Sequence, residues 1–235
     1  MNPEPKSETF SGLHFSLLLY SIWITVFTGI ACIQKQIFWL ASAAFIGFSA
    51  WVGRYFFDHK ELSFPYGPAN AVTLLRFCGL ISVSIMHPGL SLFVTGLILT
   101  VICLGDLVDG YIARTFKMSS DIGEYMDKET DALFVLLTCF ILFQRGFTGS
   151  WILWLGLIRY VYFIAVFFLL KPNQKEHKDP QARWIATLVF IGILSCYFVP
   201  YYLSFPLLAG ASLLLAYSFT KSVFIAAGWL KVPQQ

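Results

Sequence analysis

The sequence predicts an all-α protein, a polytopic bundle of about eight membrane-spanning helices. Of its 235 residues, 57% are hydrophobic and only 12% are charged, and the mean hydropathy is +0.71. A soluble domain carries about 25% charged residues. This chain therefore has too few polar residues to cover a globule, and its excess apolar surface must face lipid. The same composition excludes a disordered or collagen-like chain and argues against nucleic-acid binding.

Eight spans are predicted from the intervals between charged residues, because about 20 helical residues cross a bilayer core of about 30 Å. The charge-free run from Trp184 to Thr220 is too long for one crossing, and Pro200 and Pro206 are expected to divide it. Residues 58–68, which are polar and contain proline and glycine, are expected to join the second span to the third. The predicted spans cover residues 13–34, 36–57, 69–86, 89–114, 120–145, 150–170, 182–203 and 205–230.

Basic residues are unevenly divided between the two ends of such a bundle. Eight spans place both termini on one side, and that side would hold most lysines and arginines, whereas the other holds only Lys35 and Arg145. Because the basic side of a membrane protein faces the cytoplasm, both termini are expected there. The N-terminus lacks a basic segment and a cleavage site, so the first span is expected to be retained. Residues 1–67 are predicted to be an added segment before a six-helix unit at 68–235.

Acidic residues are concentrated in one short segment. Seven of the 13 Asp and Glu residues lie between positions 106 and 131. Asp106 and Asp109 are three residues apart, and Asp127 and Asp131 are four apart, so helical spacing places each pair on one face. The two helices are expected to be antiparallel neighbours joined by a short turn. Four carboxylates would then converge just inside the cytoplasmic boundary.

Four carboxylates at this depth predict a divalent-metal site, because their repulsion and desolvation need neutralising. Oxygen ligands favour Mg²⁺, Mn²⁺ or Ca²⁺ over zinc or copper. Two such ions could bridge a pyrophosphate, and a carboxylate not bound to metal could accept a proton from an attacking hydroxyl. Gly110 and Gly123 leave room beside the acids for a ligand. The other acids, Asp121, Glu124 and Glu129, point to other faces and are expected to contact water.

Eight specified residues at fixed spacing extend along this segment: Asp106-x2-Asp109-Gly110-x2-Ala113-Arg114-x8-Gly123-x3-Asp127-x3-Asp131. This pattern is identical to the signature of the CDP-alcohol phosphotransferase (CDP-alcohol phosphatidyltransferase) family. The run Pro68-Ala-Asn70-Ala-Val-Thr73-Leu-Leu-Arg76 also resembles the opening of that family's first core helix. The resemblance covers residues 68–230, which makes 68–235 the catalytic core and leaves the first two spans outside it.

This resemblance implies an integral membrane enzyme of phospholipid synthesis. The hydroxyl of an alcohol attacks the phosphorus distal to cytidine in a CDP-linked donor, and CMP is released. Asp106, Asp109 and Asp127 are implied to bind two Mg²⁺ or Mn²⁺ ions. Asp131 is implied to contribute to this metal site and to act as the base, so Asp127 and Asp131 are the expected catalytic residues. Members of the family are commonly homodimers. The residues implied to surround the donor are Asn70, Thr73, Arg76, Gly110, Ala113, Arg114 and Gly123.

Arg76 has two open roles at this stage, a salt bridge to an aspartate or a contact to donor phosphate. Arg159 lies deep in the sixth span and needs an internal partner. If Arg159 and Arg183 lie beside the aspartates, they form a cationic pocket that suits a phosphate. That pocket favours a phosphorylated polyol, such as glycerol 3-phosphate or inositol phosphate, as acceptor. The expected donor is CDP-diacylglycerol.

The alternative enzyme handles choline, ethanolamine or serine, as acceptor or as CDP-linked donor. Many family members carry Gly-Lys-x-Lys-Thr where this chain has Ala182-Arg-Trp-Ile-Ala-Thr187, so the acceptor stays open. A divalent-cation channel or transporter is the alternative outside enzymes. It is disfavoured because no inverted repeat is visible.

Overall fold

The computed structural model describes residues 6–58, 68–116, 121–169, 180–226 and 229. All regular structure in these ranges is helical, with eight α-helices and two short 3₁₀ turns. The side chains at several helix ends, residues 6–14 and 107–116 among them, are outside the description. The helices are α1 (Lys6–Gln34), α2 (Ile37–Asp58), α3 (Pro68–Met86), α4 (Leu92–Phe116), α5 (Asp121–Gln144), α6 (Leu153–Leu169), α7 (Pro180–Phe198) and α8 (Tyr201–Ala226), with turns η1 (His87–Gly89) and η2 (Ser150–Ile152).

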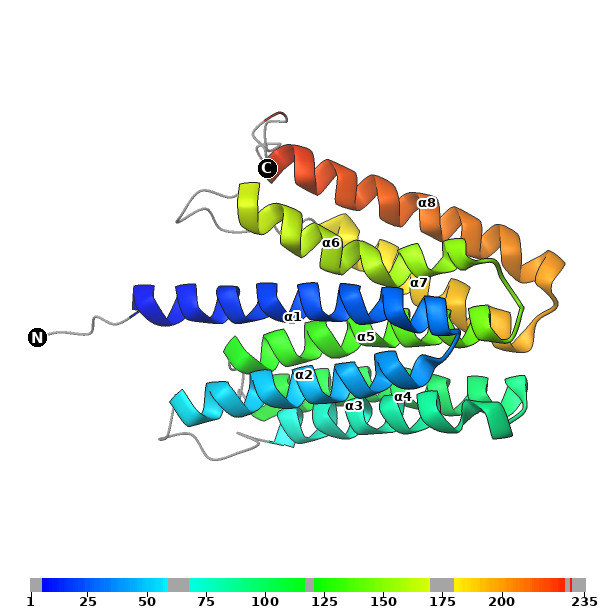
Figure 1. Ribbon diagram of the computed structural model, residues 1–235, viewed down its shortest axis with the longest axis horizontal. Coiled ribbons are helices and arrows are strands. Elements are labelled where there is room, and N and C mark those ends of the chain that lie inside the picture. Colours follow the sequence, from blue (N-terminus) through cyan, green and yellow to red (C-terminus); the bar gives the residue numbers. More distant parts are fainter. Residues whose placement is uncertain (1–5, 59–67, 117–120, 170–179, 227–228, 230–235) are drawn as a thin grey trace, which may run out of the picture.

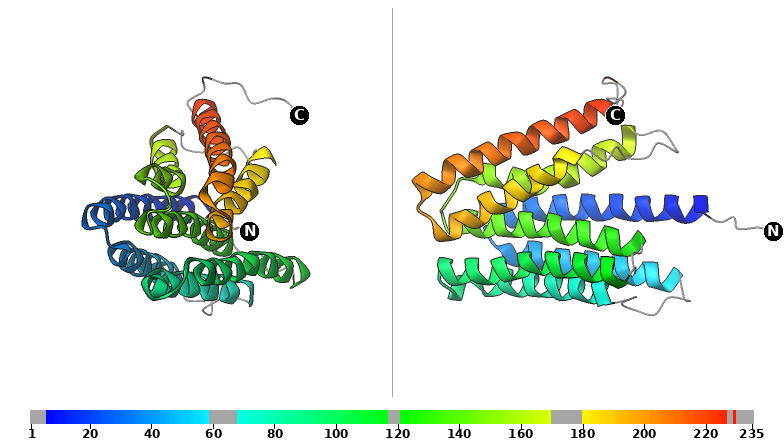
Figure 2. Two further views of the ribbon diagram at one scale, coloured as in Figure 1. Left: turned by 90° about the vertical axis from the view of Figure 1, so that its right-hand side faces the viewer. Right: turned by 180° about the vertical axis from the view of Figure 1, so that it is seen from behind.

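The helices run alternately up and down along one long axis, so that α1 begins and α8 ends at the same end of the bundle (Figure 1). Helices α6, α7 and α8 lie on one side and α3 and α4 on the other, with α1, α2 and α5 between them (Figure 2). Helix α5 contacts α2, α3, α6 and α7. Its second half is almost entirely apolar, and residues 132–142 are all buried. The core therefore follows α5.

The outer surface is apolar. Five helices in the described ranges, α1, α2, α3, α6 and α8, are long and apolar enough to cross a membrane. Large side chains such as Leu75 and Leu213 are each 73% exposed, which is unfavourable in water and favourable in lipid. The predicted all-helical, polytopic membrane architecture is confirmed.

Proline separates the last two helices at one of the two predicted positions. Helix α7 ends at Phe198, and the Pro200 carbonyl accepts the backbone N–H groups of Leu203 and Ser204, at 3.0 and 3.1 Å, to begin α8. The prediction that Pro206 also breaks the chain is wrong, because Pro206 lies inside α8. It is the sixth residue of α8, and its missing N–H removes one hydrogen bond, to the Tyr202 carbonyl, a loss that helices in membranes tolerate.

Two glycines allow close contact between helices. A Cβ atom built on Gly156 of α6 would lie 2.4 Å from the Leu136 Cα atom of α5. A Cβ atom on Gly96 of α4 would lie 2.5 Å from the Tyr197 Cβ atom of α7. Glycine lets the backbones approach at these two crossings, as small residues do at helix interfaces in membranes. The Gly156 crossing fixes α6 against the helix that carries two of the clustered aspartates.

Candidate active site

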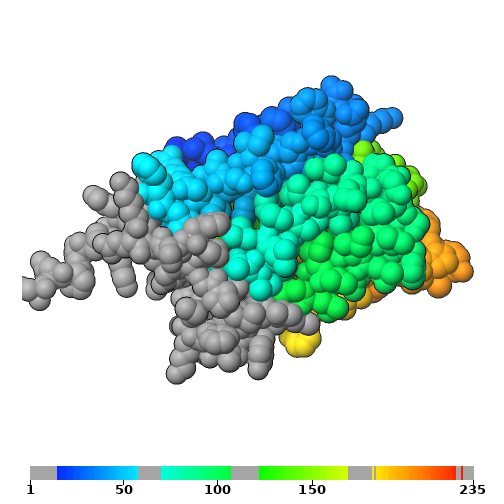
Figure 3. Space-filling model, turned by 90° about the horizontal axis from the view of Figure 1, so that it is seen from below, coloured from blue at the N-terminus to red at the C-terminus, as the bar shows by residue number. Residues whose placement is uncertain are grey.

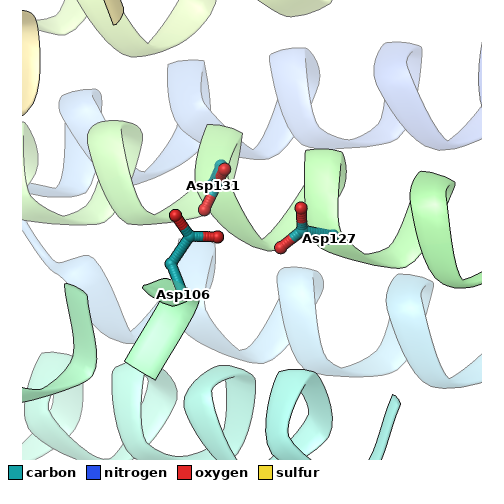
Figure 4. Close-up of side chains that lie close together, drawn as sticks. All are labelled: Asp106, Asp127 and Asp131. Carbon is teal, nitrogen blue, oxygen red and sulfur yellow. The ribbon is translucent and has the colours of Figure 1, made fainter. Parts of the chain in front are cut away.

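Three aspartates from two helices come together. Asp106 projects from α4, and Asp127 and Asp131 project from α5 toward it (Figure 4). One carboxylate oxygen from each lies within 4.8 Å of the others. Their side chains are half-buried, with exposed fractions of 43%, 38% and 33%. The predicted convergence of these three residues is confirmed.

The aspartates are placed by helix geometry. At a rise of about 1.5 Å per residue, Asp127 and Asp131 lie about 9 Å and about 15 Å along α5 from its first residue. A spacing of four residues turns the helix by little more than one turn, so both carboxylates project from the same face. The cluster therefore lies inside the bundle and is still reached by solvent.

Arg76 of α3 joins the three carboxylates. Its Nη1 donates to Asp127 Oδ1 at 3.0 Å and lies 3.5 Å from Asp106 Oδ1, and its Nη2 donates to Asp131 Oδ1 at 2.8 Å. Its Nε donates to the Ile102 carbonyl at 3.2 Å, and the side chain is only 4% exposed. Of the two roles that the sequence left open, the salt bridge is present. Contact with donor phosphate stays a prediction.

Gly105 makes room for this arginine. A Cβ atom at Gly105 would lie 3.0 Å from both Cγ and Cδ of Arg76. The Arg76 side chain therefore passes over the α4 backbone immediately before Asp106, where only a hydrogen atom stands. Sequence reasoning missed this residue, because nothing except its position next to Asp106 distinguishes it from other glycines.

The charges of the cluster favour a divalent cation. Counted over the described side chains alone, three carboxylates and one guanidinium leave a formal charge of about −2 at a half-buried position, where uncompensated charge is costly. The ligand atoms that the three aspartates offer are all carboxylate oxygens, which suit Mg²⁺ or Mn²⁺ better than softer metals. The residues present therefore fit a divalent-metal site.

The protein-family model of the CDP-alcohol phosphatidyltransferases matches residues 67–227, well over half of the chain. The chain belongs to the CDP-alcohol phosphatidyltransferase family. Members of this family transfer a phosphatidyl group from a CDP-linked alcohol to a second alcohol, and generally use a divalent metal ion. The chain is thus a membrane transferase. The match leaves α1 and α2 outside the family domain. No solved structure matches the chain.

The other predicted donor residues are described only in part. Asn70 and Thr73 are buried on α3, within two turns of Arg76, and Gly123 is half-buried on α5, four residues before Asp127. Asn70 and Thr73 are therefore near Arg76 in the sequence, and Gly123 is near Asp127. Contact of these three residues with a donor stays a prediction. The side chains of the remaining signature positions, Asp109, Gly110, Ala113 and Arg114, fall outside the described residues.

The prediction that Glu129 contacts water is wrong. Glu129 was expected to contact water, but it is 4% exposed, and its Oε1 accepts a hydrogen bond from Arg159 Nη2 of α6 at 2.6 Å. Glu129 is two residues from Asp127 and from Asp131, so it points to the opposite face of α5, which packs against α6 rather than facing water. Glu124 does contact water as expected, with a side chain 52% exposed and paired with Lys128 at 2.8 Å. The side chains of Asp121 and Arg183 lie outside the described residues.

Proposed function

We propose that this chain transfers the phosphatidyl group of CDP-diacylglycerol to the hydroxyl of a small polar alcohol and releases CMP. The observation that carries the proposal is the half-buried cluster of Asp106, Asp127, Asp131 and Arg76 inside a helical membrane bundle. The acceptor oxygen forms a bond to the phosphorus distal to cytidine. The bond from that phosphorus to the CMP oxygen breaks, and CMP leaves with the electron pair.

The aspartates would hold the metal. Asp106, Asp127 and Asp131, together with Asp109 from the signature, would bind two Mg²⁺ or Mn²⁺ ions. When bound, these ions would polarise the pyrophosphate and stabilise the oxygen of the leaving CMP. Asp131 lies one turn further along α5 than Asp127 and is the proposed base that accepts the proton of the acceptor hydroxyl. Arg76 holds all three carboxylates together and supplies a guanidinium for donor phosphate.

An apolar pocket between two helices, one of which carries Arg76, supports a lipid donor. It lies between α2 and α3, has a volume of about 230 Å³, and is lined mainly by apolar side chains, including Phe48, Leu74 and Phe77. Leu74 and Phe77 lie within one helical turn of Arg76 along α3 but on other faces of the helix, so an acyl chain in this pocket would lie at the same level of α3 as Arg76. Figure 3 shows α2 and α3 side by side at the surface of the bundle. The wall contributed by α2 comes from outside the family domain.

The sequence leaves two classes of acceptor open, phosphorylated polyols and aminoalcohols. Binding of a phosphorylated polyol, such as glycerol 3-phosphate or inositol phosphate, would depend on a cationic pocket that includes Arg159 and Arg183. The ion pair with Glu129 balances the charge of Arg159 and so weakens its attraction for phosphate. An aminoalcohol, such as choline, ethanolamine or serine, is therefore the second candidate acceptor, because a balanced ion pair does not repel its cationic head.

One assay tests the reaction and the acceptor together. Purified protein is incubated with labelled CDP-diacylglycerol, Mg²⁺ or Mn²⁺ and each of the five alcohols in turn, and CMP release is measured. We expect CMP release with one acceptor class only, loss of release in EDTA, and loss in Asp127→Asn. Glu124→Gln is the matched control, because it removes an exposed acid from the same helix. Full CMP release in excess EDTA would contradict the metal assignment.

We also propose a homodimer whose active site opens at the cytoplasmic face, with both termini on that side. The uneven distribution of lysines and arginines along the sequence supports this orientation. Protease accessibility of a tag at each terminus in sealed inverted vesicles tests it. Protection of both tags from protease would reverse the orientation. Chemical cross-linking in the membrane tests the dimer.

A further inference from the structure

Three buried polar atoms meet on the other side of α5, and none has a hydrogen-bond partner within the part of the chain that the structure describes. They are the hydroxyl oxygens of Tyr20 (α1) and Tyr160 (α6) and Oε2 of Glu129 (α5). Tyr20 is 4% exposed and Tyr160 is 1% exposed, and their ring centroids lie 6.4 Å apart in an edge-on arrangement. Glu129 and Arg159 lie close enough to act electrostatically on both tyrosine hydroxyls.

Such a concentration of unsatisfied atoms is unusual in a protein interior. Buried polar atoms are nearly always hydrogen-bonded, and the requirement is strictest where the surroundings are hydrocarbon rather than water. Here three atoms from three helices lie near one another, beside an ion pair that already satisfies Glu129 Oε1. A guest molecule that forms hydrogen bonds with these atoms would remove the deficit.

The available groups define the chemistry of the guest. Glu129 Oε2 can only accept a hydrogen bond, whereas the two tyrosine hydroxyls can donate or accept. The charges of Glu129 and Arg159 cancel, so the pair gives neither an anion nor a cation the net attraction that would compensate for its desolvation. A neutral hydroxyl can donate to Glu129 Oε2 and accept from a tyrosine. We propose that Tyr20, Glu129, Tyr160 and Arg159 form a binding site for a small neutral hydroxyl-bearing molecule.

Two sources could supply that hydroxyl, water or an alcohol. The site lies on the face of α5 opposite to Asp127 and Asp131, at about 200° around the helix, so it is separate from the aspartate cluster. Only the alcohol source rests on the proposed transferase function. Tyr20 belongs to α1, which the family match does not include, and α1 packs against α6. The site is thus completed by the N-terminal helix that this chain adds to the family domain.

Radiolytic hydroxyl-radical footprinting of the purified enzyme tests the proposal directly, because radicals form from water at the site. Tyr197 is the internal control, since it is equally buried at 3% exposure and its hydroxyl already donates to the Thr138 carbonyl at 2.8 Å. We expect Tyr20 and Tyr160 to be oxidised several-fold faster than Tyr197. Rates unchanged by added glycerol assign the site to water, and rates lowered by glycerol assign it to an alcohol. Oxidation of both tyrosines no faster than that of Tyr197 overturns the proposal.

Thermal unfolding of phenylalanine variants gives a second, independent readout. If a guest bonds to the hydroxyls, Tyr20→Phe and Tyr160→Phe lower the Tm, as Tyr197→Phe does. If the cluster is dry, removing an unsatisfied hydroxyl leaves the Tm unchanged or raises it, and the proposal fails. Both measurements are made without substrate. Their results therefore test the hydroxyl-binding site independently of the transferase assay.

Discussion

Replacing Gly156 with alanine tests the tight crossing of α5 and α6. The new Cβ atom would lie 2.4 Å from the Leu136 Cα atom and 2.7 Å from the Leu136 Cβ and Cδ1 atoms. Ordinary contacts of a Cβ atom begin at about 3.4 Å, so the two helices must separate by about 1 Å at this point. Because the nearest atom belongs to the backbone, a change of side-chain rotamer cannot relieve the contact.

The size of the effect follows from two opposing terms. Alanine in place of glycine gains about 1 kcal/mol of helix propensity. Overpacking a tight contact costs about 1–3 kcal/mol, and a clash with backbone belongs at the upper end. We expect Gly156→Ala to lower the free energy of unfolding by about 1–2 kcal/mol. Since α5 carries Asp127 and Asp131, the displacement should also lower turnover.

Thermal unfolding of the purified protein in detergent measures the first effect, and CMP release below the unfolding temperature measures the second. Gly29→Ala is the matched control. Gly29 also lies inside a helix, but no heavy atom beyond its own stretch of helix lies within 4 Å of where a Cβ atom would stand, so only the gain in propensity applies. If Gly156→Ala unfolds at or above the temperature of Gly29→Ala, the close approach of α5 and α6 is refuted.

Three further substitutions test the site and its support. Asp131→Asn should lower turnover by at least about 10²-fold, with donor affinity little changed, because the proton acceptor is lost; near-normal turnover removes the assignment. Gly105→Ala should displace Arg76 by a few tenths of an ångström. We expect kcat/KM to fall by about 10-fold, which corresponds to about 1.4 kcal/mol in the activation free energy. Unchanged kinetics would show that catalysis does not depend on the position of Arg76. Arg145→Ala should reduce the free energy of unfolding by about 1–3 kcal/mol, because its guanidinium donates to the carbonyls of His87 and Leu90 at the turn between α3 and α4. Turnover of Arg145→Ala at low temperature should change little, since Arg145 follows the end of α5 and is far from Asp131. A loss of activity without a loss of stability would contradict this structural role of Arg145.

The features predicted from sequence depend on local spacing. Intervals between charges mark the helices, because lipid excludes charged residues whatever the tertiary packing. The spacing of Asp127 and Asp131 fixes them to one face, because helix geometry alone decides that. These two inferences are sufficient to define the bundle and most of the aspartate cluster.

The features that were missed depend on which helix lies next to which. Glu129 and Arg159 are 30 residues apart, and nothing in the spacing of either shows that α5 and α6 bring them together. The role of Gly105 is equally hidden, since it depends on the path of an arginine from α3. Pro206 was overestimated as a helix breaker, because a membrane helix can tolerate the one hydrogen bond that proline removes, and the sequence alone does not show that α8 begins at Tyr201.

The N-terminal helix pair restricts how two copies of this protein can associate. Helix α1 covers part of α6, and α2 covers parts of α3 and α5, with Ile24, Leu40 and Phe48 buried among the residues of the core. A second copy cannot occupy surfaces that are already covered from within the same chain. Subunit pairing must therefore use the outward faces of α1 and α2 themselves, or the parts of the other helices that stay exposed, such as the face of α3 that carries Leu75. Relatives that lack such a pair have those surfaces open to lipid or to another subunit, so the quaternary arrangement of one member need not transfer to another.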